Sequence, residues 1–379
     1  MMANIVFSFF SGAGLLDLGF ENANYEIVFV NEYNQLFLEA YQYARRNREH
    51  TPRYGYHPCD IRLFLSGDSN VNLHHYIENE HIAGNRVGFI GGPPCPDFSV
   101  GGKNEGKNGK NGILARSYVD LIIDCMPDFF VFENVKGLVR TAKHREYYEE
   151  LKSTLSDAGY YLCDRMLNSL NFGVPQDRER IIMIGIRSNL SNINGLLDID
   201  GRLNFPWYYN AMFPDVNEVK SLAWMKSQDF HQNKVRYWPR RLPEQYKELA
   251  VETWFRRNNV TNHPNGNDVF SVKAGLTKMQ TIAEGDVSRK SFKRLHRWRY
   301  SPTAAYGNNE VHLHPYKIRR LSVAETMAIQ SLPAWFSLPP TMTLSNKFKV
   351  IGNGVPYLMA ESIANTLREM LDELQEENP

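Results

Sequence analysis

Residues 5–14 of the chain read IVFSFFSGAG, a mostly apolar run that ends in two glycines. The run favours a buried β-strand, and glycines after a strand form a tight turn because they tolerate positive φ angles. Asp17 follows near the start of a helical stretch. We therefore predict a strand–turn–helix unit whose glycines let backbone N–H groups approach a ligand. The third glycine of a dinucleotide fingerprint is missing, and an ordinary turn without a ligand would show the same pattern.

Strand-like and helix-like segments alternate along the first half of the chain. Apolar runs span residues 27–30, 87–90, 128–132 and 181–186, and helical periodicity spans residues 36–45, 118–126 and 147–158. Strands that alternate with helices indicate an α/β fold built on a wound sheet. Because ligands bind at the carboxyl ends of strands in such sheets, we expect one shared cleft there. Its candidate residues are Gly12, Glu32, Asp60, Cys95 and Glu133.

The bulk composition restricts the class of protein only loosely. The 43 basic residues nearly balance the 42 acidic ones, so the net charge does not indicate nucleic acid. No apolar run approaches the ~18 residues of a membrane span, and the N-terminus is typical of a first strand rather than a signal peptide. The four cysteines match neither a zinc site nor a disulfide framework, which favours a reduced, cytoplasmic setting. We expect no metal and no membrane.

A change of composition divides the chain. Residues 1–187 carry the α/β alternation, whereas residues 188–314 are rich in Asn, Trp, Tyr, Arg and Pro without it. Helical periodicity returns within residues 315–379. We therefore predict a main domain formed by the two outer segments and a smaller module inserted between them.

Two acidic residues, an isoleucine and the glycine turn form a candidate nucleoside pocket. Glu32 ends the second apolar run, where a carboxylate can accept hydrogen bonds from both ribose hydroxyls. Asp60 and Ile61 could meet the amino group and the face of an adenine. Each residue alone would be an ordinary strand end, and only the combination favours the pocket.

Residues 91–99 read GGPPCPDFS and hold a candidate nucleophile, Cys95. A lone cysteine is usually a small buried hydrophobe. Here two prolines fix the backbone before the thiol and two glycines clear space around it, as a positioned nucleophile requires. Residues 100–112 are rich in Gly, Asn and Lys, which suits either a flexible linker or a mobile loop that closes on a phosphate-bearing substrate.

Three further motifs bear polar groups. Glu133-Asn134-Val135 ends an apolar strand, where burial would raise the pKa of the carboxyl and suit it to proton transfer. Arg178 and Arg180 alternate along an extended segment and so point to the same side, although a surface pair balanced by neighbouring acids would look alike. Residues 351–356, IGNGVP, form a tight turn before the last helix.

Basic residues interleave with aromatic ones in the inserted module. Residues 289–300 read RKSFKRLHRWRY, and similar clusters stand at residues 237–241 and 254–257. A charge run is usually a solvated face, but this pattern in a nearly neutral chain favours a nucleic-acid surface.

In their order along the chain, these motifs resemble the DNA (cytosine-5)-methyltransferase family of bacterial restriction–modification systems. The resemblance implies a Rossmann-like, S-adenosylmethionine-dependent methyltransferase fold: a mixed α/β sheet with helices on both faces and a smaller inserted target-recognition domain. It implies cofactor contacts from Phe10, Ser11, Gly12, Ala13, Gly14, Leu15, Glu32, Asp60, Ile61, Pro94, Leu114 and Asn353. Departures from the family pattern are Leu15-Leu16, Pro96 and Lys110-Asn111, and they remove no group that the chemistry requires.

The resemblance also implies a mechanism. The Cys95 thiolate would add to C6 of a cytosine, Glu133 would hold N3, Arg178 would bind O2 and Arg180 would brace the site. The cytosine must be flipped out of the duplex because its reacting atoms are inaccessible in the stack. We expect DNA contacts from Ser99, Lys103, Arg240, Arg241, Arg289, Lys290, Arg294, Arg297 and Arg299.

The partners expected are double-stranded DNA and a cognate restriction endonuclease that acts separately on the same sites. The protein is expected to be a monomer associated with the bacterial nucleoid. Three alternatives remain open: a tRNA cytosine-5 methyltransferase, a catalytically silent DNA-binding protein of the same fold, and a nicotinamide-dependent oxidoreductase. The incomplete glycine fingerprint and the Pro-Pro-Cys turn disfavour the last.

Overall fold

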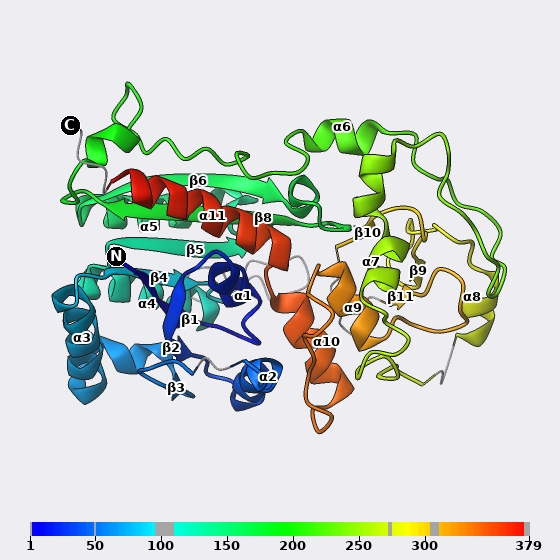
Figure 1. Cartoon of the computed structure of the whole chain (residues 1–379), viewed down its shortest axis with the longest axis horizontal. Coiled ribbons are helices and arrows are strands. Elements are labelled where there is room, and N and C mark those ends of the chain that lie inside the picture. Colours follow the sequence, from blue (N-terminus) through cyan, green and yellow to red (C-terminus); the bar gives the residue numbers. More distant parts are fainter. Residues whose placement is uncertain (1, 49–50, 95–109, 272–274, 304–310, 375–379) are drawn as a thin grey trace.

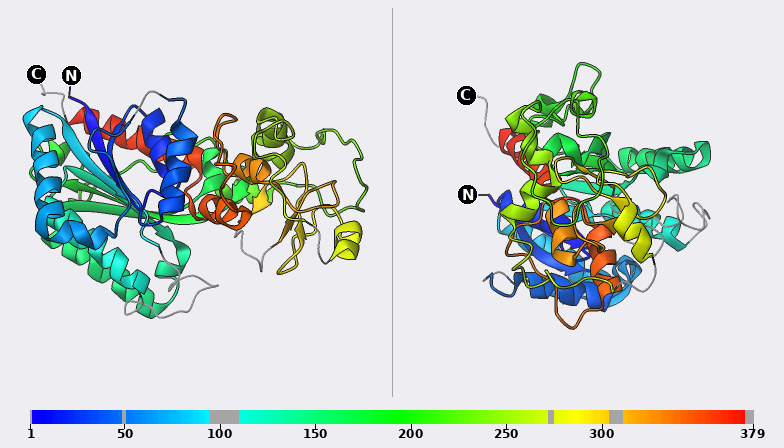
Figure 2. Two further views of the ribbon diagram at one scale, coloured as in Figure 1. Left: turned by 90° about the horizontal axis from the view of Figure 1, so that it is seen from below. Right: turned by 90° about the vertical axis from the view of Figure 1, so that its right-hand side faces the viewer.

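The computed structural model describes residues 2–48, 51–94, 110–271, 275–303 and 311–374. Figure 1 shows a large α/β body beside a smaller module that carries α6, α7 and α8, and Figure 2 shows the same two parts from below and from the side. Among the described residues, no helix is long and apolar enough to cross a membrane.

A seven-stranded mixed sheet forms the centre of the large body. Its order is β3-β2-β1-β4-β5-β8-β6. The strands are β1 (Asn4–Phe9), β2 (Glu26–Asn31), β3 (Tyr56–His57), β4 (Arg86–Gly91), β5 (Phe129–Val135), β6 (Tyr160–Asn168) and β8 (Glu179–Arg187). The first five pair in parallel, whereas β8 runs antiparallel to both β5 and β6. The antiparallel β8 therefore begins at the edge where the parallel strands end.

Helices cover both faces of this sheet, which confirms the fold class predicted from the sequence. One face carries α1 (Leu15–Asn22), α2 (Gln35–Arg45) and α11 (Tyr357–Glu373), and the other carries α3 (Gly67–Ile82), α4 (Lys110–Cys125) and α5 (Ala142–Asp157). Strands β1, β2 and β4 are buried on both faces and read as largely apolar runs, as expected for a parallel sheet between two helical layers.

Polar side chains set where several helices begin. Asn34 accepts a hydrogen bond from the backbone of Leu36 at the start of α2, and Thr141 does the same for His144 at α5. Ser322 and Glu325 form a reciprocal capping box at α9 (Val323–Ile329). Each cap satisfies backbone N–H groups that have no partner within the helix, and contributes about 1 kcal/mol.

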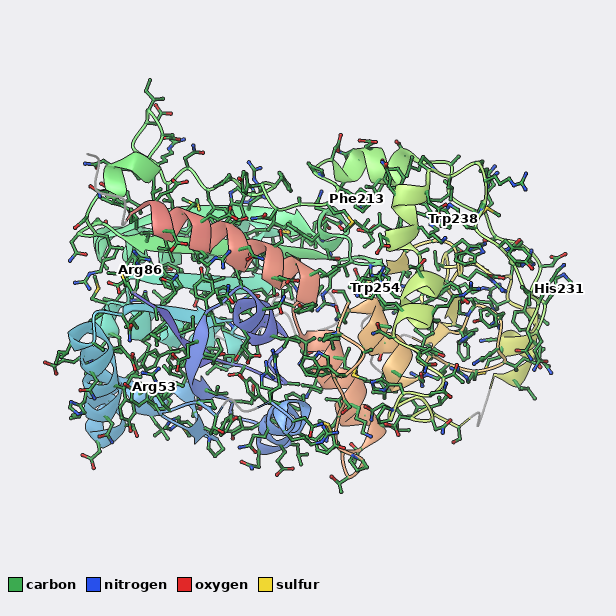
Figure 3. All side chains as sticks on the ribbon, viewed as in Figure 1. Arg53, Arg86, Phe213, His231, Trp238 and Trp254 are labelled. Carbon is green, nitrogen blue, oxygen red and sulfur yellow. The ribbon has the colours of Figure 1, made fainter. Side chains whose placement is uncertain are left out.

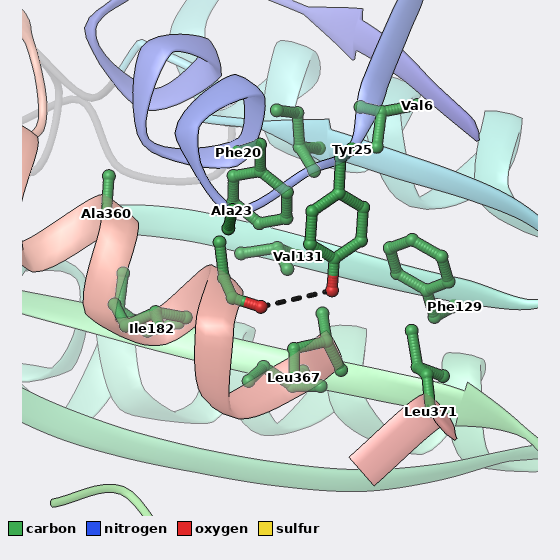
Figure 4. Close-up of a cluster of buried hydrophobic side chains, with 14 of the residues drawn as sticks. Val6, Phe20, Ala23, Tyr25, Phe129, Val131, Ile182, Ala360, Leu367 and Leu371 are labelled. Atoms are coloured by element: carbon green, nitrogen blue, oxygen red, sulfur yellow. Dashed lines mark hydrogen bonds between the residues drawn. The ribbon is translucent and has the colours of Figure 1, made fainter. Parts of the chain in front are cut away.

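The last helix packs against the first. Figure 4 shows the cluster between them, in which the Tyr25 hydroxyl donates to the carbonyl of Ala364 over 3.1 Å. Phe20 and Leu367 are completely buried in this cluster. The two helices approach so closely that a Cβ on Gly19 would lie 2.5 Å from the backbone nitrogen of Glu361. The C-terminal helix is therefore an integral layer of the main domain.

The smaller module holds little regular structure. Its helices are α6 (Val216–Ser221), α7 (Val251–Arg257) and α8 (Leu276–Thr281), and two short strands, β9 (Lys293–Arg294) and β11 (His312–Leu313), pair in parallel. Strand β10 (Ser301–Pro302) pairs with β7 (Gln176–Asp177) of the main body. Large aromatic side chains hold the module together, among them Phe213, Trp238 and Trp254, which Figure 3 labels.

Packing refines the domain division expected from composition. Leu196, Phe205 and Trp207 belong to the same buried cluster as α11, so the chain stays with the main body beyond Arg187. We propose that the module begins near Phe213, which packs instead against Tyr246. Composition could not locate this boundary, because residues 193–207 cover the sheet without regular βα alternation.

A substitution at Gly19 tests the tight helix contact. Gly19→Ala places a methyl group against the backbone of α11, so the helices must separate and the free energy of unfolding should fall by about 1–3 kcal/mol. Gly195→Ala is the matched control, since a Cβ there meets nothing within 4 Å. Urea unfolding of both variants measures the difference. Equal midpoints for the two variants would show that α1 and α11 are not in close contact.

Candidate active site

A cavity of about 880 Å³ opens at the carboxyl ends of β1, β2, β4 and β5. Most of the residues expected in the cleft line it: Phe10, Ser11, Gly12, Ala13, Leu15, Glu32, Asp60, Ile61, Pro94, Leu114, Glu133, Arg180 and Asn353. The fold therefore gathers into one cavity residues that lie more than three hundred positions apart in the chain. The glycine turn and Glu133 lie at different parts of this one cavity.

The glycine turn after β1 has an uncommon backbone. Phe10, Gly12 and Gly14 all have positive φ angles, of 53°, 58° and 75°. For Phe10, a residue with a Cβ, this conformation is strained and is seen mainly at functional sites. Gly14 is required for space as well, because a Cβ there would lie 2.4 Å from the ring of Tyr41. The turn is thus held in one shape by its surroundings.

Glu32, which directly follows β2, forms a hydrogen bond with the backbone of this turn. One of its carboxylate oxygens accepts from the backbone nitrogen of Gly12 over 2.9 Å, and the other from that of Asn34 over 2.7 Å. Burial raises the pKa of Glu32, and the two backbone hydrogen bonds oppose that rise. Each carboxylate oxygen keeps a further lone pair for a hydroxyl donor in the cavity.

Asp60 lines the same cavity. It caps the 3₁₀ helix η1 (Ile61–Leu65), and both its oxygens bond the side chain of Arg62, at 2.9 and 2.7 Å. The Arg62 guanidinium lowers the pKa of Asp60. An adenine amino group would therefore share Asp60 with Arg62, while the buried Ile61 offers an apolar contact.

Glu133 and Arg180 form an ion pair in the wall of the same cavity. Their side chains are only 9% exposed, and the Arg180 Nε lies 2.9 Å from a Glu133 oxygen. Burial raises the pKa of Glu133, and Arg180 and Arg178 oppose the rise. Gly92 leaves room for this carboxylate, since a Cβ there would lie 2.6 Å from it. A carboxyl whose pKa is raised by burial holds a proton more readily than an exposed one.

Arg178 has a different place from the one expected. It is 1% exposed, and its guanidinium donates to the carbonyls of Gly352 and Gly354 over 2.6 and 3.0 Å. Arg178 therefore braces the C-terminal turn, whereas Arg180 lines the cavity, so the two side chains do not share one place as expected from the sequence. The physical reason is that Arg178 stands in the break between β7 and β8, so a single extended strand does not carry both side chains.

The nucleophile turn is described only as far as Pro94. Cys95, Ser99 and Lys103 lie outside the described residues. The approach to Cys95 is nevertheless fixed, because Asn134 donates to the carbonyl of Pro93 over 3.3 Å. The turn that leads to the cysteine is thus tied to the strand that carries Glu133.

The basic residues of the module separate into two groups. Arg240, Arg241, Arg289 and Lys290 are exposed, and Arg299 is half-buried. Arg294 and Arg297 are 0% and 3% exposed, so their assignment to DNA contacts is corrected. Arg294 donates to the carbonyls of Ile282 and His314, and Arg297 pairs with Glu284 at 2.7 Å. Both hold together a module that has few strands and helices of its own.

A few functional candidates were missed from the sequence. Asp17 lines the cavity although it is 1% exposed, and it accepts a hydrogen bond from Ser8. Tyr33 is 74% exposed and also lines the cavity. The position of Tyr33 directly after Glu32 was a usable signal, whereas Asp17 could not be distinguished from an ordinary helix-start acid.

One group of described residues could hold a metal ion. His74, Asp124 and Cys125 each offer a ligand atom within 4.8 Å of the others. None of the three lines the large cavity. The group is therefore separate from the candidate active site.

The fold and the site define an α/β protein with one cavity lined both by a glycine turn and by a buried acid–arginine pair. A family model described as C-5 cytosine-specific DNA methylase matches residues 5–369. The chain thus belongs to the C-5 cytosine-specific DNA methylase family and is a DNA (cytosine-5)-methyltransferase. This family consists of S-adenosylmethionine-dependent methyltransferases.

Comparisons with individual proteins agree with this family assignment. The chain is 53% identical over 369 residues to the type II methyltransferase M.NmeDI of Neisseria meningitidis serogroup C, covering 97% of this chain and 84% of the relative. It is 29% identical to M.FnuDI of Fusobacterium nucleatum, covering 96% and 94%. Among solved structures, the Entamoeba histolytica methyltransferase EhMeth matches with a TM-score of 0.59 at 16% identity, covering 99% and 100%. The S. pombe Dnmt2 methyltransferase matches with a TM-score of 0.59 at 12% identity over the same shares. Those two structural matches confirm the fold.

The buried Asp17 gives a prediction on pH. Burial raises its pKa from 3.8 to about 6, although Arg45 and Ser8 act in the opposite direction. Since the folded state binds the proton more tightly, this group stabilises the protein most below its unfolded pKa, and that contribution is lost as the pH rises through about 6.

Asp17→Asn mimics the protonated form and removes this dependence. From about pH 4 to about pH 7, the variant should gain on the order of 2 kcal/mol in unfolding free energy relative to the unaltered protein. Urea unfolding at the two pH values measures the change. A difference between the two proteins that stays constant with pH would contradict the raised pKa.

Proposed function

We propose that this chain is the sequence-specific methyltransferase of a type II restriction–modification system, and that it methylates C5 of a cytosine flipped out of duplex DNA. The single observation that carries the proposal is the buried Glu133–Arg180 pair beside the glycine turn in one cavity. A cytosine base needs partners for N3 and O2, and a methyl donor must lie next to it. The names of the relatives M.NmeDI and M.FnuDI support the type II assignment.

The residues present fit S-adenosylmethionine. Glu32 can accept from ribose hydroxyls, Ile61 and Leu114 offer apolar contacts to the adenine, and the glycine turn forms part of the same cavity wall. Phe10, Ser11, Ala13, Pro94 and Asn353 complete the proposed pocket. When bound, this cofactor supplies an electrophilic methyl group.

The protein's own residues prepare the cytosine. The thiolate of Cys95 adds to C6, and C5 thereby becomes nucleophilic. Glu133 holds a proton at N3, and we assign O2 to Arg180, because Arg178 is engaged with Gly352 and Gly354. After methylation a base, a role that water can fill, takes the proton from C5, and the Cys95 thiolate is released by elimination.

The inserted module would read the DNA sequence. Arginines suit the O6 and N7 acceptors of guanine in the major groove, and contacts with phosphates set the register. Arg240, Arg241, Arg289, Lys290 and Arg299 remain the proposed contacts, together with Ser99 and Lys103. We propose a monomer at the bacterial nucleoid, which acts on the same sites as a separate restriction endonuclease.

Bisulfite sequencing tests the function directly. A mixed-sequence duplex pool incubated with the protein and S-adenosylmethionine should show protected cytosines within one short recurring motif. Cys95→Ala should abolish this protection while the cofactor still binds, because only the addition to C6 is lost.

Protection by Cys95→Ala equal to that of the unaltered protein would contradict the covalent mechanism. If the unaltered protein bound the cofactor and protected no DNA, tRNA would be the next acceptor to assay. Without methylation of either, the silent DNA-binding alternative would stand.

Glu32 tests the nucleoside pocket. Glu32→Ala removes the acceptor for the ribose and the contact that holds Gly12, so the dissociation constant for S-adenosylmethionine should rise by about tenfold or more. Glu39→Ala is the matched control, because Glu39 is an exposed residue of α2 that does not line the cavity. Calorimetric titration measures both variants, and equal affinities would argue against the pocket.

A further inference from the structure

We infer that Arg45, which does not line the cavity, is a positioning residue for the cofactor turn. This inference rests on the proposed S-adenosylmethionine pocket. Arg45 is the last residue of α2 and is 4% exposed. No motif singles it out in the sequence, where it reads as one cation in the run Arg45-Arg46.

The guanidinium of Arg45 holds the turn through its carbonyls. It donates to the carbonyl of Gly14 over 2.8 Å and to that of Ala13 over 3.3 Å. In a trans peptide the C=O and N–H bonds point in opposite directions. Because the carbonyl of Gly14 points toward Arg45, the N–H of Leu15 in the same peptide points away from Arg45. Leu15 lines the cavity.

The guanidinium is itself fixed on its remaining sides. Its Nε donates to a Glu21 oxygen over 2.6 Å, and the group lies 3.8 Å from the centre of the Tyr41 ring. Burial alone would lower the pKa of Arg45, but Tyr41, Glu21 and Asp17 outweigh this and raise it, so the group stays cationic. A planar fork of donors that engages a carboxylate and two carbonyls at once is specific to arginine.

Gly14 and Arg45 depend on each other sterically. A Cβ at Gly14 would lie 2.6 Å from an Arg45 nitrogen and 2.4 Å from the ring of Tyr41. The missing side chain of Gly14 is thus the space that the guanidinium and the ring occupy. The turn therefore requires glycine at position 14 because Arg45 and Tyr41, which do not line the cavity, pack against it there.

The unit formed by β2 and α2 consequently holds the turn at two points. Glu32, before the helix, accepts from the N–H of Gly12, and Arg45, at its end, donates to the carbonyls of Ala13 and Gly14. One rigid element thereby fixes both donor and acceptor groups of the turn. The Gly14 carbonyl also accepts from the backbone N–H of Leu18, so loss of Arg45 should loosen the turn without releasing it, and so weaken cofactor binding.

The test compares three variants of the full chain. Arg45→Met removes the hydrogen bonds and should raise the dissociation constant for S-adenosylmethionine by about tenfold, whereas Arg45→Lys keeps the charge and should raise it by only about threefold. Arg48→Met is the matched control, because Arg48 also pairs with Glu21, at 3.2 Å, but has no contact with the turn. Its affinity should stay within about twofold of the unaltered protein.

Three readouts separate positioning from a merely structural role. Calorimetry gives the affinity, thermal unfolding gives the stability, and steady-state kinetics divide the effect between KM for the cofactor, KM for DNA and kcat. The inference requires a rise in KM for the cofactor with KM for DNA unchanged. A lowered thermal midpoint with unchanged cofactor affinity in Arg45→Met would overturn it, and so would unchanged affinity in Arg45→Lys if the methionine variant does not fold.

The same titration distinguishes a failure of the proposed function from a failure of the inference on Arg45. If the unaltered protein failed to bind S-adenosylmethionine, the proposed function would be wrong, and the inference with it. If the unaltered protein binds and Arg45→Met binds equally well, only the inference on Arg45 is overturned.

Discussion

The antiparallel pairing of β5 with β8 is the constraint on which the site depends. In this register Val135 faces Arg180 and Glu133 faces Ile182, so Glu133 and Arg180 are diagonal neighbours on one side of the sheet. A slip of one residue would turn either side chain to the opposite face. The buried strands prevent such a slip, because it would exchange the side chains between two closely packed faces and move the charged pair out of the cavity wall. The ion pair is thus positioned by the core rather than by its own attraction.

The cofactor side and the base side of the cavity are linked through the backbone. Arg178 ties the strand pair to the carbonyls of Gly352 and Gly354, and a Cβ at Gly354 would lie 2.4 Å from Leu15. Leu15 follows the glycine turn that Glu32 and Arg45 hold. A continuous set of contacts therefore runs from Glu133 to the proposed ribose site. In a transfer reaction both partners must be held at the correct distance, and this arrangement supplies such a frame.

Much of this could be predicted from the sequence, and the limits have physical causes. The buried strands were found because both their faces are apolar, whereas β6 was missed because most of its residues are only half-buried and alternate irregularly. Helix α3 was missed because few of its residues are buried. The cavity residues were found because they follow strands that end at one edge. The burial of Arg294 and Arg297 was not predictable, since a cation that supports loops has the same local sequence as one that faces DNA.

The packing of α11 on α1 has a consequence for the order of events during synthesis. Residues 352–354 complete a cavity whose other walls are made of residues translated much earlier, and the helix after them covers α1. While the ribosome still holds these late residues, the glycine turn lacks its Leu15–Gly354 contact and α1 lacks its cover. A nascent chain therefore has the inserted module translated before the cavity can close.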